Sequence, residues 1–373
     1  DAAIEIVIED GNPAVDQSSI KLKLSGAEVT PDVNKTGNTI TVSYQPDSDY
    51  PSGSTQTVEL TFTAGAERTD SWQFTTQEFF PLQLLAWWDF DDASDPAMAV
   101  DNVNGNEGAI ESDAMYSGDS EGHTGQAGDR AIDLGIDSNL QLVRVGDVRF
   151  LNQVVAARDQ VTFSFWQSRF DLANSSVFWA LSPSSSDGQR GAQAHAPWGN
   201  DNIYFDTAGC CDAGMQRINA PMTTFPDYTD STWWEEWHHF AFVKSGALKR
   251  IYLDGQLFLE GQNTAPLPSD FTEFIIGAAG DGGNSVHGLM DDFAVYGNGL
   301  SEDLIALLAS GTPPDEIPGL VPWAPRENYL IGLNFGADEA DGAGTGTLAA
   351  ADSAGVIAQA NWNNLARLEG ESS

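Results

Sequence analysis

The chain has 373 residues, enough for two or three domains, and its hydrophobic content of 41% is enough for a sizeable core. It carries 55 acidic residues against 16 basic ones, a formal net charge of -39. Such a surface repels phosphate backbones and anionic lipid headgroups, which argues against nucleic acid and membrane surfaces as partners. It suits a salt-rich environment, in which charge repulsion is screened.

Gly, Asn, Asp, Ser and Thr are abundant and long amphipathic helical patterns are almost absent, which predicts an all-β fold of many short strands. No apolar run reaches membrane-spanning length, and no signal peptide opens the chain. The first residues already have the pattern of a strand. We therefore expect the chain to be part of a longer extracellular or cell-surface polypeptide.

Residues 1–78 contain short apolar–polar alternations bounded by turn residues, the signature of half-buried strands. The alternating runs are Ile4–Ile8, Ile20–Leu24, Ile40–Tyr44, Val58–Phe62 and Trp72–Phe74. Five or more such strands at this spacing predict an immunoglobulin-like sandwich. The pattern resembles the bacterial Ig-like repeats that act as spacers in large surface proteins.

A second strand-rich unit is predicted over residues 79–311, ending in a short helix at Leu300–Leu308. Its strand patterns are Leu84–Phe90, Ala131–Leu134, Gln160–Trp166, Ser176–Leu181, Asn202–Asp206, Trp237–Val243, Arg250–Leu253, Phe274–Gly277 and Gly288–Tyr296. The first and last of these strands are expected to pair, as the two ends of a jelly roll do.

Three segments of this unit carry a family resemblance. In order they read Trp-His-His-Phe-Ala-Phe-Val from Trp237, Arg-Ile-Tyr-Leu-Asp-Gly from Arg250 and Met-Asp-Asp-Phe-Ala-Val-Tyr from Met290. Together they resemble the laminin-G-like, concanavalin A-like jelly-roll family over roughly residues 83–311. The resemblance implies a lectin-like, ligand-binding jelly roll.

The remaining chain is expected to form a linker and a partial β segment. Residues 312–325 are rich in proline, which predicts a stiff linker. Residues 326–373 contain strand-like patterns but are too few to bury a core alone. They either begin a further module or return to complete the N-terminal sandwich.

Cys210 and Cys211 are adjacent and are the only cysteines. Consecutive Cα atoms lie ~3.8 Å apart, shorter than ordinary disulfides accept, so a disulfide here would distort its own backbone. Such strain usually marks a functional site. A vicinal disulfide would also present a compact apolar knob, suited to the hydrophobic face or methyl group of a sugar. The alternative is two free thiols.

Polar and aromatic residues surround this pair in the sequence. The sequence also resembles one subgroup of this family. The resemblance rests on a His-x-Pro-Trp segment, followed by a Tyr-x-Asp strand and a Gly-Cys-Cys loop. A sugar site needs a flat ring and planar groups for hydroxyls. The predicted ligand-binding residues are His195, Trp198, Asn202, Asp206, Cys210, Cys211 and Arg217. In the alternative interpretation Asp206 and Arg217 form a salt bridge that holds the loop, and Trp198 is a core residue.

The sequence of the same unit offers ligand types for two metals, zinc and calcium. Zinc on His195 and both cysteines is disfavoured, because adjacent cysteines are poorly placed to chelate one tetrahedral ion. Calcium is the expected cofactor, with Asp101, Asp291 and Asp292 as ligands, since loop carboxylates suit it and related jelly rolls often hold a structural calcium. The alternative is a solvated acidic loop.

Catalytic motifs are missing from the sequence. Jelly-roll glycosidases that resemble this fold carry a Glu-x-Asp-x-x-Glu or Glu-x-Asp-x-Glu run, and the chain has neither. We therefore predict a non-catalytic, extracellular carbohydrate-binding adhesion module. A deoxy sugar with an exposed methyl group, such as fucose, would suit the cysteine platform. The alternatives are a structural or protein–protein adhesion module and, less favoured, a hydrolase domain.

Overall fold

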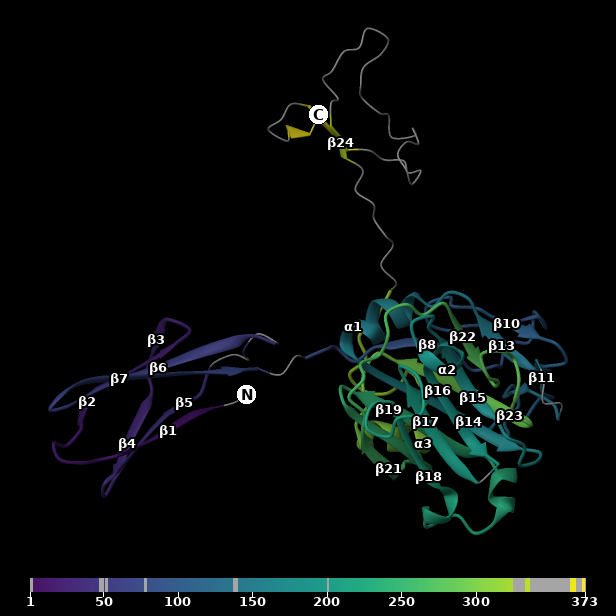
Figure 1. The fold of residues 1–373 in the computed structure, drawn as a ribbon, viewed down its shortest axis with the longest axis horizontal. Helices are drawn as coiled ribbons and strands as arrows, with labels where there is room; N and C mark the ends of the chain where they lie inside the picture. The colour runs from purple at the N-terminus through teal and green to yellow at the C-terminus, as the bar shows by residue number, and fades with distance from the viewer. Residues whose placement is uncertain are drawn as a thin grey trace, which may run out of the picture. The chain divides into compact units, whose positions relative to one another are not determined.

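The computed structural model describes residues 3–46, 50, 53–76, 79–136, 140–199 and 201–324, together with the backbone of three later strands (Figure 1). The chain divides into two compact units, Asp1–Pro81 and Leu82–Ser373. Both units are built almost entirely from antiparallel strands, so the all-β prediction is confirmed.

The described residues of the first unit form seven strands in two sheets. The strands are β1 (Ile4–Glu9), β2 (Asp16–Leu24), β3 (Ala27–Val29), β4 (Asp32–Thr36), β5 (Thr39–Tyr44), β6 (Thr55–Ala64) and β7 (Ala66–Thr75). One sheet has the order β1-β5-β4 and the other β3-β2-β6-β7. Alternation along β5 and β6 sends every second side chain inward, and Leu22, Ile40, Val42 and Val58 are fully buried between the sheets.

The strand pairing of this unit leaves the immunoglobulin-like prediction unconfirmed. An immunoglobulin constant domain also has seven strands, but its second strand pairs with the fifth. Here β2 pairs with β3 and β6, while β5 pairs with β1 and β4. The predicted short strands are therefore present, in a different pairing order.

The second unit contains the strands β8 to β23 and the short helices α1 to α3. The strands are β8 (Leu84–Trp88), β9 (Met98–Ala99), β10 (Gly108–Glu111), β11 (Met115–Tyr116), β12 (Ile132–Asp133), β13 (Leu142–Val145), β14 (Gln160–Arg169), β15 (Ser176–Leu181), β16 (Arg190–Trp198), β17 (Asn202–Thr207), β18 (Arg217–Pro221), β19 (His238–Ser245), β20 (Leu248–Leu253), β21 (Gln256–Gln262), β22 (Glu273–Ile276) and β23 (Gly288–Tyr296). The helices are α1 (Ala156–Arg158), α2 (Ser186–Gln189) and α3 (Glu302–Ala309), with further single turns at Leu151–Val155, Met222–Thr224 and Ser231–Glu235.

These strands form two large sheets. One has eight strands in the order β18-β17-β16-β15-β22-β13-β10-β9. The other has the order β11-β12-β23-β14-β19-β20-β21, and β8 pairs with β23 beside β12. The predicted pairing of the first and last strands is thus confirmed, with Trp88 opposite Phe293 and Leu84 opposite Tyr296.

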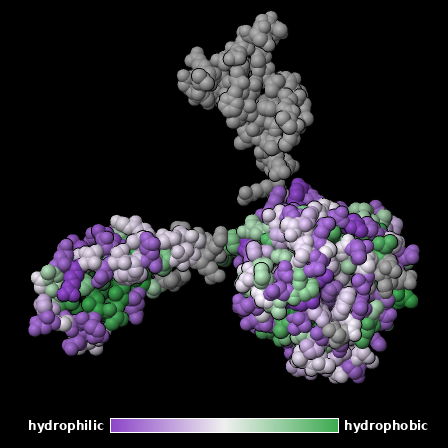
Figure 2. All heavy atoms as spheres, in the orientation of Figure 1, coloured by the Kyte–Doolittle hydropathy of each residue, from purple (hydrophilic) through white to green (hydrophobic). Residues whose placement is uncertain are grey.

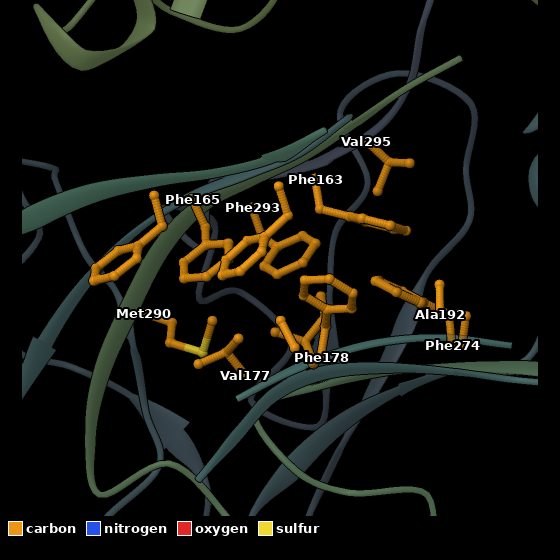
Figure 3. Close-up of a cluster of buried hydrophobic side chains, with 14 of the residues drawn as sticks. Phe163, Phe165, Val177, Phe178, Ala192, Phe274, Met290, Phe293 and Val295 are labelled. Atoms are coloured by element: carbon orange, nitrogen blue, oxygen red, sulfur yellow. The ribbon is translucent and has the colours of Figure 1, made fainter. Parts of the chain in front are cut away.

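The core between the two sheets is dominated by phenylalanine rings (Figure 3). Phe165 of β14 stacks on Phe293 of β23, with ring centroids 5.2 Å apart. Phe178 of β15 bridges to the opposite sheet, with its centroid 4.3 Å from that of Phe163. Because the rings interlock across the interface, they set the spacing of the two sheets.

The proline-rich segment predicted as a linker packs against the second unit from residue 312 as far as Pro322. Ile317 is 3% exposed and joins the apolar cluster around Tyr296, whose hydroxyl donates to the Pro314 carbonyl at 3.0 Å. Leu320 forms a parallel bridge with Leu82. This segment is therefore part of the jelly-roll unit, because its apolar side chains cover apolar residues at the end of the sheet.

The predicted C-terminal β segment, residues 326–373, lies largely outside the described residues. Its described part consists of β24 (Leu333–Phe335), β25 (Asn363–Ala366) and β26 (Glu371–Ser372). The strand β25 pairs in parallel with β24 and antiparallel with β26.

The visible surface of the jelly-roll unit is mostly hydrophilic, with hydrophobic residues in small separate areas (Figure 2). Among the described residues, no helix is both long enough and apolar enough to cross a bilayer.

We predict that Phe178→Ala lowers the free energy of unfolding of the jelly-roll unit by about 3–5 kcal/mol, because it leaves a cavity in the aromatic core. Phe170 is 48% exposed, so Phe170→Ala is the matched control and should change the stability by less than about 0.5 kcal/mol. Chemical denaturation of both variants measures the difference. Equal losses would show that the aromatic core does not have this role.

Candidate functional site

A pocket of about 660 Å³ opens on the outer face of the sheet that contains β15, β16, β17 and β18. Strand alternation explains which side chains reach it. Along β15, Phe178 and Ala180 face the core while Trp179 faces outward, and along β17, Phe205 faces the core while Tyr204 faces outward. The same sheet thus supplies a hydrophobic core on one side and the pocket lining on the other.

The loop between β17 and β18 carries the disulfide between Cys210 and Cys211. Cys211 is exposed and Cys210 is partly buried, and both line the pocket. The Nη2 atom of Arg217 lies 3.0 Å from the sulfur of Cys210. Because the two sulfurs are bonded to each other, neither is a thiolate, which is the form in which cysteine binds zinc.

Asp206 lies beneath the pocket, fully buried between two arginines. Its Oδ1 accepts a hydrogen bond from Arg217 Nε at 2.6 Å, and its Oδ2 accepts from Arg217 Nη2 at 2.6 Å and from Arg190 Nη1 at 2.7 Å. Burial alone would lower the pKa of Arg217, but its hydrogen bond to Asp206 and the negative charge of Asp206, with smaller contributions from Tyr204 and Asp187, together outweigh this and raise it. Asp206 therefore holds both guanidinium groups in place.

Each guanidinium also covers an aromatic face. Arg190 lies 4.7 Å above the ring of Trp179, and Arg217 lies 4.7 Å above the ring of Tyr204. The covered rings cannot at the same time stack on a ligand on those faces. Among the tryptophan and tyrosine residues that line the pocket, Trp198 is the one without a cation on its ring in the described part of the chain.

His195 is a neutral, buried residue at the pocket wall. It is 6% exposed, and its ring centroid lies 4.1 Å from that of Trp198. Burial, followed by the positive charge of Arg190, lowers the pKa of His195 to about 3. Its Nδ1 lies 3.2 Å from the Ser175 carbonyl oxygen, which can only accept, so we assign the proton to Nδ1 and acceptor character to Nε2.

The loop before β16 forms one rim of the pocket in an uncommon backbone conformation. Asp187, Gly188 and Gln189 have φ values of 52°, 78° and 58°. Left-handed backbone at the two non-glycine residues, Asp187 and Gln189, costs free energy, and such positions cluster at binding sites. Asp187 and Asp281, both exposed, add carboxylates at the rim.

The structure brings together five of the seven predicted ligand-binding residues. His195, Trp198, Cys210, Cys211 and Arg217 line the pocket. Asp206 does not line it, and the salt bridge to Arg217 that the alternative interpretation anticipated is present. Asn202 also lies outside the lining, and its Nδ2 contacts the hydroxyl of Tyr204 at 3.4 Å.

Sequence reasoning missed several residues of the pocket. These are chiefly Trp179, Asp187, Arg190, Tyr204, Asp281 and Asn284. Alternation along β15 and β17 could have placed Trp179 and Tyr204 on the outer face. The acids at the rim come from loops distant in sequence, and no local pattern connects them.

The three predicted calcium ligands do not form one ligand set. Asp101 is 5% exposed, and its carboxylate accepts hydrogen bonds from the backbone N–H groups of Trp87, Val103, Asn104 and Asn106 and from the Asn106 side chain. Five donors occupy the lone pairs of its two oxygens, so Asp101 caps its loop and does not fit the role of a calcium ligand.

Asp291 and Asp292 lie in a different cluster. Asp291 Oδ2 accepts from the His123 backbone N–H at 2.8 Å, and Asp292 Oδ1 accepts from Trp87 Nε1 at 2.8 Å. Burial, followed by repulsion from Asp291, raises the pKa of Asp292 to about 7. Ligand atoms of His123, Asp129 and Asp291 lie within 4.8 Å of one another, and a set containing nitrogen is a poor fit to calcium, which prefers oxygen.

The match to a family model agrees with this architecture. Residues 145–306 match the family described as the concanavalin A-like lectin/glucanases superfamily, so this part of the chain has a concanavalin A-like fold. A search of curated proteins found no match.

Two solved structures illustrate the similarity. Domain 4 of AbnA, a GH43 extracellular arabinanase from Geobacillus stearothermophilus solved with arabinotriose, is 17% identical, with a TM-score of 0.43, covering 62% of this chain and 100% of that domain. The binding domain of botulinum neurotoxin serotype G is 12% identical, with a TM-score of 0.45, covering 61% of this chain and 51% of that one.

We predict that Asp206→Asn lowers the free energy of unfolding by about 3–5 kcal/mol, because it leaves two partly buried guanidinium groups without their carboxylate. The matched control is Asp147→Asn, which breaks an exposed pair with Arg149 and should cost less than about 1 kcal/mol. Urea denaturation measures both. Similar small losses in the two variants would contradict the clamping role of Asp206.

We also predict that His195 makes the free energy of unfolding depend on pH. Between pH 6.5 and 4.5 the unfolded chain takes up a proton at this residue, while the folded chain, with a pKa of about 3, does not. Stability is therefore lost as the pH falls, by about 2 kcal/mol over this window. His195→Asn should lose correspondingly less than the parent protein in denaturation series at both pH values. Parallel slopes for the two proteins would contradict the assignment.

Proposed function

We propose that the jelly-roll unit binds a glycan in this pocket and that the protein is a non-catalytic, extracellular adhesion module. One observation carries the proposal: an exposed disulfide knob at Cys211 stands at the same pocket as Trp198, an indole on whose ring no described cation lies, and two oriented guanidinium groups. Apolar surface for the carbon face of a sugar and fixed polar groups for its hydroxyls are the two requirements of a carbohydrate site.

The polar groups divide into donors and acceptors. Arg217 uses its Nε and Nη2 atoms on Asp206, and Arg190 uses its Nη1, so each guanidinium keeps further N–H groups for a ligand. Asp187 and Asp281 at the rim supply acceptors. A vicinal diol can donate to a rim carboxylate while it accepts from a guanidinium. In this proposal Asp206 acts through the arginines and does not touch the sugar.

A neutral deoxy sugar such as fucose fits this arrangement. Its methyl group would pack on the disulfide and Trp198, whereas the rim carboxylates and the net charge of -39 disfavour an acidic glycan. An open pocket of this kind buries little ligand area, so the affinity for one sugar is weak. Repetition within a longer surface polypeptide would compensate through avidity.

We predict selective binding to fucosylated glycans on an array, lost when a thiol reduces the disulfide. The double variant Cys210→Ser/Cys211→Ser should bind at least tenfold more weakly, and thiol should have no further effect on it. Repeating the array with a calcium chelator tests whether binding needs calcium, the expected cofactor. Unchanged glycan binding would agree with the observation that Asp101 does not fit the role of a calcium ligand.

Paired arginine variants control for general damage. Arg190→Ala should reduce binding at least tenfold, while Arg250→Ala, which breaks an Arg–Glu pair outside the pocket, should not. An intact fold with no binding to any glycan would contradict the proposal and favour a structural or protein–protein adhesion module. Cleavage of an arrayed glycan would identify a hydrolase instead.

A further inference from the structure

The chain enters and leaves the jelly roll at one place. Leu82 and Leu320 form a parallel bridge, and the Val321 N–H donates to the Leu82 carbonyl at 2.8 Å. Gln83 Nε2 donates to the Pro322 carbonyl at 3.4 Å. The first unit precedes Leu82 and further chain follows Pro322, so any tension along the polypeptide passes through this bridge.

Without the segment 312–322, which packs back onto Leu82, a small force would separate β8 from β23. The N-terminal end of β8 and the C-terminal end of β23 lie side by side, with Leu84 opposite Tyr296. Tension applied there would pull β8 away from the end of its ladder and break its hydrogen bonds one at a time. Each such bond contributes only about 1 kcal/mol, so sequential loading offers little resistance.

The segment 312–322 changes the direction of the load. In a parallel bridge the two strands run the same way, so the chain before Leu82 and the chain after Leu320 are pulled in opposite directions along the strand axis. The bridge is then loaded in shear, together with the packing of Ile317 and Leu320 in the apolar cluster around Leu84 and Tyr296. Contacts loaded in shear must break together.

We propose that the bridge between Leu82 and Leu320 is a mechanical clamp, which lets the jelly roll stay folded while the polypeptide on either side of it is under tension. This further function is independent of the ligand. It concerns the rate of unfolding under load, which is set by the barrier to separating these contacts and not by the equilibrium stability.

The test stretches the full 373-residue chain between its ends in a single-molecule force experiment. Val321→Pro removes the N–H that donates to Leu82 and leaves Leu320 in an extended conformation, which the residue before a proline favours. The event that releases the chain between Leu82 and Leu320 should occur at half the force of the parent protein or less. Val321→Ala keeps the N–H at a side chain that is 46% exposed, and it should unfold at the parent force.

Thermal unfolding without load distinguishes a clamp from a general stabilising contact. We expect the midpoints of both variants to stay within a few degrees of the parent value. Equal unfolding forces for the proline variant and the parent protein would overturn the proposal. So would an acceleration of unfolding in the proline variant that is as large without load as under load.

Discussion

Two-residue alternation along β15, β16 and β17 is the constraint on which the rest of the jelly roll depends. It sends Phe178, Ala194 and Phe205 into the core and Trp179, His195 and Tyr204 to the pocket side. A shift of one residue in any of these strands would exchange the two sets. The aromatic core that holds the sheets together therefore also fixes which side chains line the pocket.

Asp206 fixes the positions of the positively charged groups at the pocket. The chain has 16 basic residues against 55 acidic ones, and two of the basic residues converge on one buried carboxylate. Each guanidinium is held by that carboxylate on its edge and by an aromatic ring on its face, so neither is free to turn. Binding groups that are already ordered lose little conformational entropy when a ligand arrives.

The contacts that close the jelly roll lie at the place where the chain enters and leaves it. The pairing of β8 with β23 brings the two ends of the jelly roll together, and the segment through Pro322 covers them with Ile317 and Leu320. The pocket lies on the outer face of the other sheet, away from this closure. The adhesion function proposed above would need both properties, a site open to its ligand and a fold that persists when the chain is pulled.

The sequence by itself determined the elements and several residues of the site. The period-two run Gln160–Trp166 identified a strand because alternation is a local property, and the adjacency of Cys210 and Cys211 identified the loop that carries the disulfide. Only the tertiary structure decided that Asp206 is sealed between Arg190 and Arg217, that Asp101 caps its own loop, and that residues 312–322 pack back onto Leu82. Each of these depends on which distant strands and loops become neighbours, and the free energy of burying a charge or an apolar side chain is set by those neighbours.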